Sequence, residues 1–302
     1  MLGERRFAVL IDADNVSAKY IKYILDEISN YGVATYKRIY GDWTRPSSAS
    51  WKDVLLEYSV TPVQQYGYTV GKNATDSAMI IDAMDILYSG NVEGFCLVSS
   101  DSDFTKLSSR LRESGMLVVG MGERKTPKPF IASCNQFKYL DVLAETEKNS
   151  LVMENSHLQN ENIKDKKQGA AKEAETDQLS KQSRNADAGE NGDGTKSMTD
   201  IEVIKAAILK MMNEVDEADQ GMNMGELGSR LVKRYPDFDV RNYGDTKLSK
   251  FLKKFDFLEI NSKGKGGSSM WVSLRSEAHP KEEEKKTTAK PKKKRNYRKK
   301  SK

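Results

Sequence analysis

Histidine, cysteine and long hydrophobic runs are scarce in this sequence of 302 residues, and each scarcity argues against a class of protein. The two histidines, His157 and His279, lie in polar tracts, which argues against His-based catalysis and His-rich zinc sites. The two cysteines, Cys96 and Cys134, have apolar or small neighbours, so we predict core thiols rather than a disulfide. No apolar run approaches the roughly 18 residues of a membrane span, and the N-terminus leads directly into a predicted strand. We therefore expect a cytoplasmic protein with no membrane partner.

The N-terminal half contains a regular alternation of apolar strands and amphipathic helices. Its first strand, residues 7–11, is a continuous apolar run, which is typical of a strand buried on both faces. Further strands are predicted at 33–40, 61–68, 95–99, 116–121 and 137–140, and helices at 20–28, 51–58, 74–88 and 104–111. This order predicts an α/β domain of Rossmann-like type, with a parallel sheet covered by helices on both faces. Neither GxGxxG nor GxxxxGK[ST] is present, so a dinucleotide site or a P-loop is not supported.

Composition divides the chain into four segments. Residues 1–144 hold the α/β pattern at a formal charge of about −1. Residues 145–197 are polar and lack aromatic side chains, which predicts a disordered linker. Residues 198–274 regain apolar positions, with three predicted helices followed by two strands, the pattern of a winged helix. The tail, 275–302, carries about +9 and indicates a polyanion partner, although a role in solubility alone stays open.

Two carboxylates one residue apart, Asp101 and Asp103, follow the predicted strand 95–99 and precede a helix. Ligands of open α/β sheets bind at the carboxyl ends of the strands. Two carboxylates placed there repel each other unless a cation lies between them, and hard divalent cations prefer such oxygen ligands. Taken alone, however, the pair fits a helix N-cap better than a metal site, with Ser100 or Asp101 as the cap.

Other carboxylates in the first half favour the metal site. The first strand ends at Asp12 and Asp14, and Asp76 begins a helix on its core-facing stripe, where a carboxylate needs a partner. We predict one acidic cup for Mg²⁺ or Mn²⁺, with Asp12 and Asp101 as direct ligands and Asp76 and Asp103 holding metal-bound waters. Such a cup suits the hydrolysis of a phosphodiester, because the metal polarises the phosphoryl oxygen and lowers the pKa of a bound water.

Several other side chains are candidates for supporting roles. Asn15 is placed to hold a phosphate oxygen or a water, and Lys72 to neutralise a substrate phosphate, although a lone lysine in such a turn is usually just solvated. Ser100 is a candidate cap, and Asp82 is expected behind the site or at the surface. In the second half, six lysines are candidates for phosphate contacts, with a merely solvated basic face as the alternative: Lys247, Lys250, Lys253, Lys254, Lys263 and Lys265.

The N-terminal motifs resemble a known family. Residues 10–15 (LIDADN), Lys72 with Thr75-Asp76, and residues 99–104 (SSDSDF) are similar to the NYN domain, a PIN-like ribonuclease fold, and so is Tyr40-Gly41-Asp42-Trp43. The resemblance covers about residues 5–143. It implies a metal-dependent ribonuclease fold with matching acidic positions at Asp12, Asp76, Asp101 and Asp103. Some members of the family only bind RNA, so the resemblance does not by itself establish cleavage.

The second half is similar to another family. Residues 225–231, 235–238 and 248–252 resemble parts of an OST-HTH (LOTUS) domain, over about residues 198–274. This resemblance implies RNA binding or, in some members, docking of a protein.

The predicted function is therefore a metal-dependent ribonuclease with RNA as its partner, and two alternatives stay open. One is a non-catalytic RNA-binding or scaffold protein that keeps the acidic cup. The other is a haloacid-dehalogenase-type phosphatase, because Asp12-x-Asp14-x-Val16 matches the opening of that motif. Against the phosphatase, the late strand that ends near Met121 lacks the further acidic pair that its chemistry requires.

Overall fold

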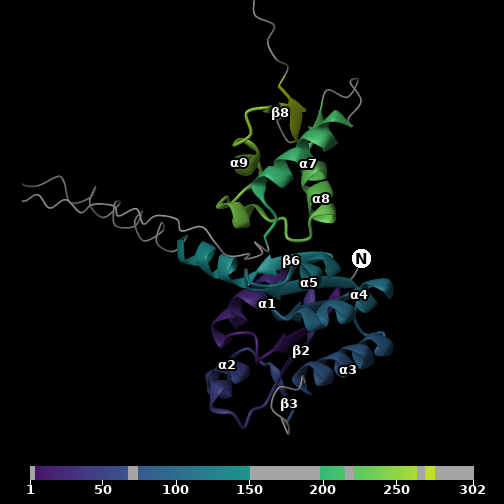
Figure 1. Ribbon diagram of the computed structural model, residues 1–302, viewed down its shortest axis with the longest axis vertical. Helices are drawn as coiled ribbons and strands as arrows, with labels where there is room; N and C mark the ends of the chain where they lie inside the picture. The colour runs from purple at the N-terminus through teal and green to yellow at the C-terminus, as the bar shows by residue number, and fades with distance from the viewer. Residues whose placement is uncertain (1–3, 67–73, 150–197, 215–220, 264–268, 276–302) are drawn as a thin grey trace, which may run out of the picture.

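The chain forms two domains stacked along the long axis of the computed structural model (Figure 1). The structure describes residues 4–66, 74–149, 198–214, 221–263 and 269–275. Residues 276–302 of the tail, most of the predicted linker, Lys72 and Lys265 lie outside the described residues.

A six-stranded sheet forms the centre of the N-terminal domain. Its strands are β1 (Arg6–Asp12), β2 (Val33–Gly41), β3 (Thr61–Gln64), β4 (Gly94–Val98), β5 (Leu117–Gly122) and β6 (Gln136–Tyr139). They lie in the order β3-β2-β1-β4-β5-β6, and all neighbouring pairs are parallel. The predicted α/β fold is confirmed. Because the strand order reverses between β1 and β4, the carboxyl ends of these two strands flank the crevice where ligands bind in such sheets.

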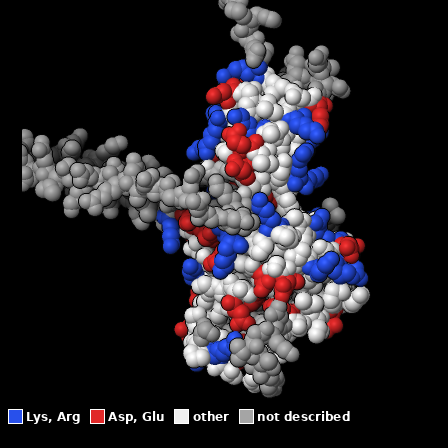
Figure 2. All heavy atoms as spheres, viewed as in Figure 1, with Lys and Arg blue, Asp and Glu red and all other residues white. Residues whose placement is uncertain are grey.

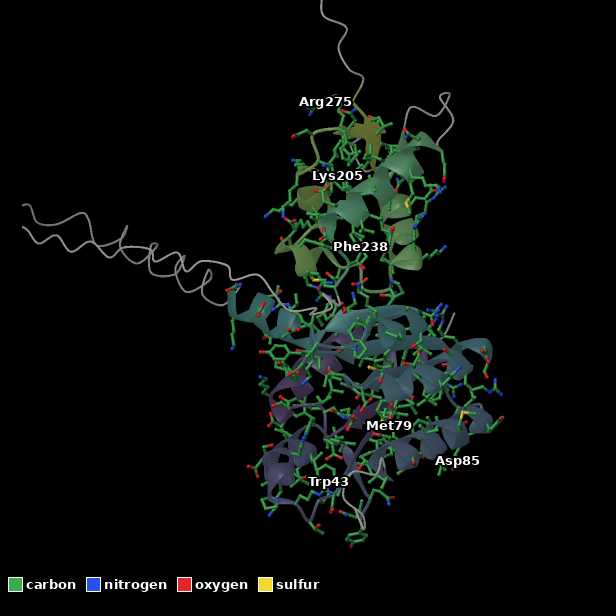
Figure 3. All side chains as sticks on the ribbon, in the orientation of Figure 1. Trp43, Met79, Asp85, Lys205, Phe238 and Arg275 are labelled. Atoms are coloured by element: carbon green, nitrogen blue, oxygen red, sulfur yellow. The ribbon has the colours of Figure 1, made fainter. Side chains whose placement is uncertain are left out.

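Helices cover both faces of the sheet, and the strand residues alternate between them. On one face lie α1 (Ile21–Ser29), α2 (Lys52–Glu57) and a helix over residues 140–149. On the other lie α3 (Ala74–Ser89), α4 (Thr105–Glu113) and α5 (Lys128–Ser133). Val9 of β1 packs in the first layer and Leu10 in the second, as the pleat requires. Met79 of α3 is fully buried against the second layer (Figure 3).

The C-terminal domain contains the predicted three helices and hairpin around its own core. Its helices are α7 (Ile201–Asn213), α8 (Met224–Arg234) and α9 (Leu248–Leu252), and its strands are β7 (Met222–Asn223), β8 (Leu258–Lys263) and β9 (Ser269–Leu274). The sheet order is β7-β9-β8, with antiparallel pairs. Among the described residues, no helix has the length and apolar character needed to cross a bilayer.

Some elements differ from those expected from the sequence. β3 ends at Gln64, whereas the apolar pattern extends it to residue 68. Neither α5 nor β7 is predicted, because segments of six and two residues are too short to show a periodic pattern of apolar residues. The helix over residues 140–149 runs past residue 144, where the change in composition places the domain boundary.

Candidate functional site

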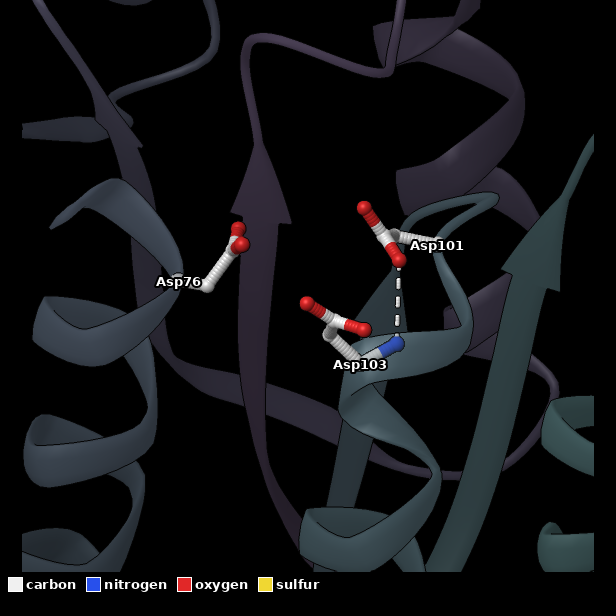
Figure 4. Close-up of side chains that lie close together, drawn as sticks. All are labelled: Asp76, Asp101 and Asp103. Carbon is white, nitrogen blue, oxygen red and sulfur yellow. Dashed lines mark hydrogen bonds between the residues drawn. The ribbon is translucent and has the colours of Figure 1, made fainter. Parts of the chain in front are cut away.

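Three carboxylates meet at the carboxyl edge of the sheet. Each of Asp76, Asp101 and Asp103 offers an oxygen, and these oxygens all lie within 4.8 Å of one another (Figure 4). Asp76 comes from the first turn of α3, whereas the other two come from the turn after β4. Asp101 and Asp103 are neighbours in the sequence, whereas Asp76 reaches them through the packing of α3 against the sheet.

Asp101 is both a helix cap, as its position suggests, and a member of the carboxylate cluster. It is the N-cap of a short 3₁₀ helix, Ser102–Phe104, and one carboxylate oxygen accepts a hydrogen bond from the backbone N–H of Asp103 at 2.9 Å. Because a carboxylate has two oxygens, the cap does not prevent Asp101 from taking part in the cluster. The cap orients the side chain and so supports a defined geometry.

Asp76 experiences the charge of the whole site. Its side chain lies near the protein interior, at 9% exposure. Burial, followed by the negative charges of Asp12, Asp101, Asp103 and Asp14, raises its pKa to about 6. The cluster therefore holds negative charge that a cation would stabilise.

Asp12 lies beside this cluster but is not one of its three members. It ends β1 at 0% exposure and accepts hydrogen bonds from Ser99 Oγ at 2.7 Å, Asn15 Nδ2 at 2.8 Å and the Asp14 N–H at 3.0 Å. Burial raises its pKa, and the hydrogen bonds from Ser99 and Asn15 oppose that rise. A carboxylate enclosed in this way is poorly placed to attack a substrate, which argues against the phosphatase alternative.

Ser99 joins the two acidic strand ends, a role that the sequence analysis did not assign to it. The buried hydroxyl donates to Asp12 and accepts from the Asp101 N–H at 3.0 Å. Ser100, the predicted support, instead accepts from the Glu123 N–H at 2.9 Å and so holds the end of β5. The only sequence signal for Ser99 is its place between an apolar strand and the first acidic residue.

Two polar contacts hold α3, and with it Asp76, against the sheet. Asp82 accepts hydrogen bonds from Arg38 and from the Tyr40 hydroxyl, both on β2. At the start of α3, the Thr75 hydroxyl donates to Asp14 at 3.1 Å. Asp82 thus supports the site through the helix rather than by contact with the cluster.

The predicted RNA-binding lysines fall into distinct groups. Lys247, Lys250 and Lys253 are exposed on and beside α9. Lys254 forms an ion pair with Asp245 Oδ2 at 2.6 Å and donates to the Tyr243 carbonyl at 3.0 Å, so its ammonium stabilises the local fold. The side chain of Lys263 is not among those described. Figure 2 shows an acidic patch on the N-terminal domain and basic side chains along the flanks of the C-terminal domain.

Comparisons with known proteins identify the families that the two domains resemble. The family model of the NYN domain matches residues 6–141, and that of the OST-HTH/LOTUS domain matches residues 199–270, which confirms both resemblances. A protein of Methanocaldococcus jannaschii, itself uncharacterised, is 28% identical over 124 residues, which are 40% of this chain and 48% of that protein. The chain thus spans about half the length of this relative. The crystal structure of a protein of unknown function from Vibrio parahaemolyticus matches 46% of this chain and 94% of its own, with 17% identity and a TM-score of 0.39.

Proposed function

Because the chain joins an NYN domain to an OST-HTH/LOTUS domain, we propose that it is a divalent-metal-dependent ribonuclease. The C-terminal domain binds RNA, and the cluster of Asp76, Asp101 and Asp103 cuts it. The observation that carries this proposal is the convergence of three carboxylates within 4.8 Å at the reversal point of the sheet. We place the activity in the cytoplasm, which agrees with the buried free thiols Cys96 and Cys134.

The donor set fits Mg²⁺ or Mn²⁺. All three groups are carboxylates, the hard oxygen ligands that these ions prefer, and no described histidine or cysteine belongs to the group. The raised pKa of Asp76 reflects the negative charge of its neighbours, which a bound divalent ion would offset. When bound, such an ion supplies Lewis-acid polarisation of a phosphoryl oxygen and a water of lowered pKa.

Residues next to the cluster hold its geometry, and residues of the C-terminal domain supply the affinity for RNA. Ser99 and Asp12 hold the backbone of Asp101, so the cluster keeps its geometry. The same negative charge repels RNA phosphates, and affinity must therefore come from elsewhere. Lys247, Lys250 and Lys253 on the C-terminal domain are exposed and suited to phosphate contacts.

The test is cleavage of end-labelled single-stranded and hairpin RNA by the full chain with Mg²⁺, Mn²⁺ or EDTA. We expect cleavage only with metal, and a loss of at least about 100-fold in rate for Asp101→Asn, since a ligand to the metal is removed. The matched control is Asp85→Asn, which changes an exposed carboxylate at the other end of α3 (Figure 3). RNA binding without metal-dependent turnover would instead indicate a non-catalytic RNA-binding protein.

A further inference from the structure

The C-terminal domain covers the open edge of the N-terminal sheet. β6 is the last strand of that sheet, and the Phe137 N–H on its outer side donates to the Pro236 carbonyl of the C-terminal domain at 2.8 Å. The hydroxyl of buried Tyr139 reaches Asp237 at 3.2 Å, and Met198 packs against the core of the N-terminal domain. The contact therefore gives a partner to a strand edge that would otherwise be unpaired.

Beside this edge lies a closed ring of four charges, one acid and one base from each domain. Arg241 donates to both oxygens of Glu27, at 2.9 and 3.0 Å, and to Asp239 at 2.7 Å. Lys138 lies 2.6 Å from Asp239 and 3.7 Å from Glu27. Exposure is 7% for the Glu27 side chain and 11% for those of Lys138 and Asp239. Burial acts to raise the pKa of Asp239, but Arg241 and Lys138 hold it well below its usual range.

The loop that carries this ring in the C-terminal domain is itself fixed. Asp237 accepts from the N–H and the hydroxyl of Thr199, both at 2.7 Å, and its carbonyl accepts from Asn242 Nδ2 at 2.7 Å. The start of α7 and the turn after α8 are thus tied together. The charges therefore project from a defined backbone.

Buried charges of this kind make one orientation preferable to others. Rotating the docked domain would leave Glu27 covered but without the bidentate bonds of Arg241, and a desolvated charge that loses its partner is costly. Charge-assisted bonds are also directional, so a rotated domain would not satisfy them. Exposed surface pairs such as Arg230–Glu226 carry no comparable constraint, because water can replace either partner.

We propose that this ring locks the two domains in one orientation, so that RNA held by the C-terminal domain reaches the acidic cluster in a fixed register. The fixed register of the RNA rests on the proposed function, whereas the fixed orientation of the two domains does not. β6, on which the C-terminal domain docks, lies two strands from β4, or about 10 Å across the sheet. A tether of about 50 residues, acting alone, would leave the domain an r.m.s. range of about 40 Å.

The lock is tested by the distance between spin labels at Glu113→Cys on α4 and Glu259→Cys on β8, two exposed positions, in the full chain with EDTA. The native thiols are buried and do not compete for the label. We expect one narrow distance distribution in the otherwise unchanged protein. Arg241→Glu and, from the opposite domain, Glu27→Arg should each broaden it, whereas the control Arg230→Glu should leave it narrow.

Two outcomes would overturn the lock: a broad distribution without any change in the ring, or a narrow one in both charge-reversed variants. Thermal melting tests whether both domains of each variant remain folded. If one charge-reversed variant does not fold, the other still tests the lock. The register is measured as the footprint of the protein on a bound RNA in the presence of EDTA. This measurement does not require the protein to cleave the RNA. One continuous protected segment that shortens in both variants supports the register, and an unchanged footprint contradicts it. Failure of metal-dependent cleavage would leave these readouts intact.

Discussion

At Asp76 the fold opposes the ionisation of a carboxylate through burial and through the charges of Asp12 and Asp101. Its pKa of about 6 lies above the value of 3.8 for a free side chain, so the folded state binds a proton more tightly than the unfolded state. By linkage, this favours the folded state below about pH 4, and the contribution is lost as the pH rises through about 6. The metal-free protein is therefore less stable at pH 7 because of this residue.

The expected consequence is that Asp76→Asn stabilises the metal-free protein at pH 7 by about 1–2 kcal/mol, somewhat less than the shift implies because neighbouring charges relax. Near pH 4 the gain should disappear, since Asp76 is then protonated in the folded state. Urea unfolding with EDTA at both pH values measures this, with Asp85→Asn as the exposed control on the same helix. Added Mn²⁺ should stabilise the parent more than the variant. An equal loss of stability at both pH values would show that Asp76 is structural instead.

The sequence predicts those site residues whose roles follow from the residues next to them. Asp101 and Asp103 follow an apolar strand directly, and their convergence with Asp76 follows from the predicted α/β order. The role of Ser99 is not predicted, because its partner, Asp12, lies 87 residues away and an uncharged serine at a strand end does not indicate a site. The position of Asp12 behind the cluster likewise depends on hydrogen bonds that no spacing reveals.

At the scale of elements, the apolar runs predict the central strands β1 and β4 because the burial of these two strands is continuous. Every residue of β4 is buried, and β1 is buried from Phe7 to Asp12. Short elements do not follow from pattern: α5 has six residues and begins after Pro127. The sequence also gives no sign that β6 is completed by a segment of the other domain.

The hydrogen bond between the outer edge of β6 and the C-terminal domain leads to a prediction for hydrogen exchange in the full chain. The Phe137 amide should exchange slowly while it is bonded to Pro236, and Arg241→Glu should accelerate its exchange at least about tenfold, because the ring no longer holds the edge closed. Amides between β1 and β4 should keep their protection in the same sample, which makes them the internal control. If the Phe137 amide exchanged at the same rate in both proteins, the edge would be closed without the ring.

At the scale of the whole molecule, the two domains contact each other through paired charges. Glu27 and Arg241 are 214 residues apart, and each on its own reads as an ordinary surface residue of a helix or turn. Composition predicts two domains joined by a linker, and so it favours a flexible tether over docking. Contacts between domains depend on complementary side chains that a single sequence does not pair.

The length of the segment between the domains distinguishes docking from tethering. Deleting residues 162–185 removes about half of that segment, and the remaining half can still extend to about 80 Å. A tether acting alone would raise the effective concentration of the C-terminal domain at the cluster about threefold, since that concentration falls with length to the power of about 3/2. A docked domain gains nothing from the deletion. We therefore expect the single-turnover rate at which bound RNA is cleaved with Mn²⁺ to stay unchanged on deletion in the parent and to rise about threefold on deletion in Arg241→Glu. A threefold rise in the parent as well would mean that the segment, and not the ring of Glu27, Lys138, Asp239 and Arg241, sets where the C-terminal domain holds RNA.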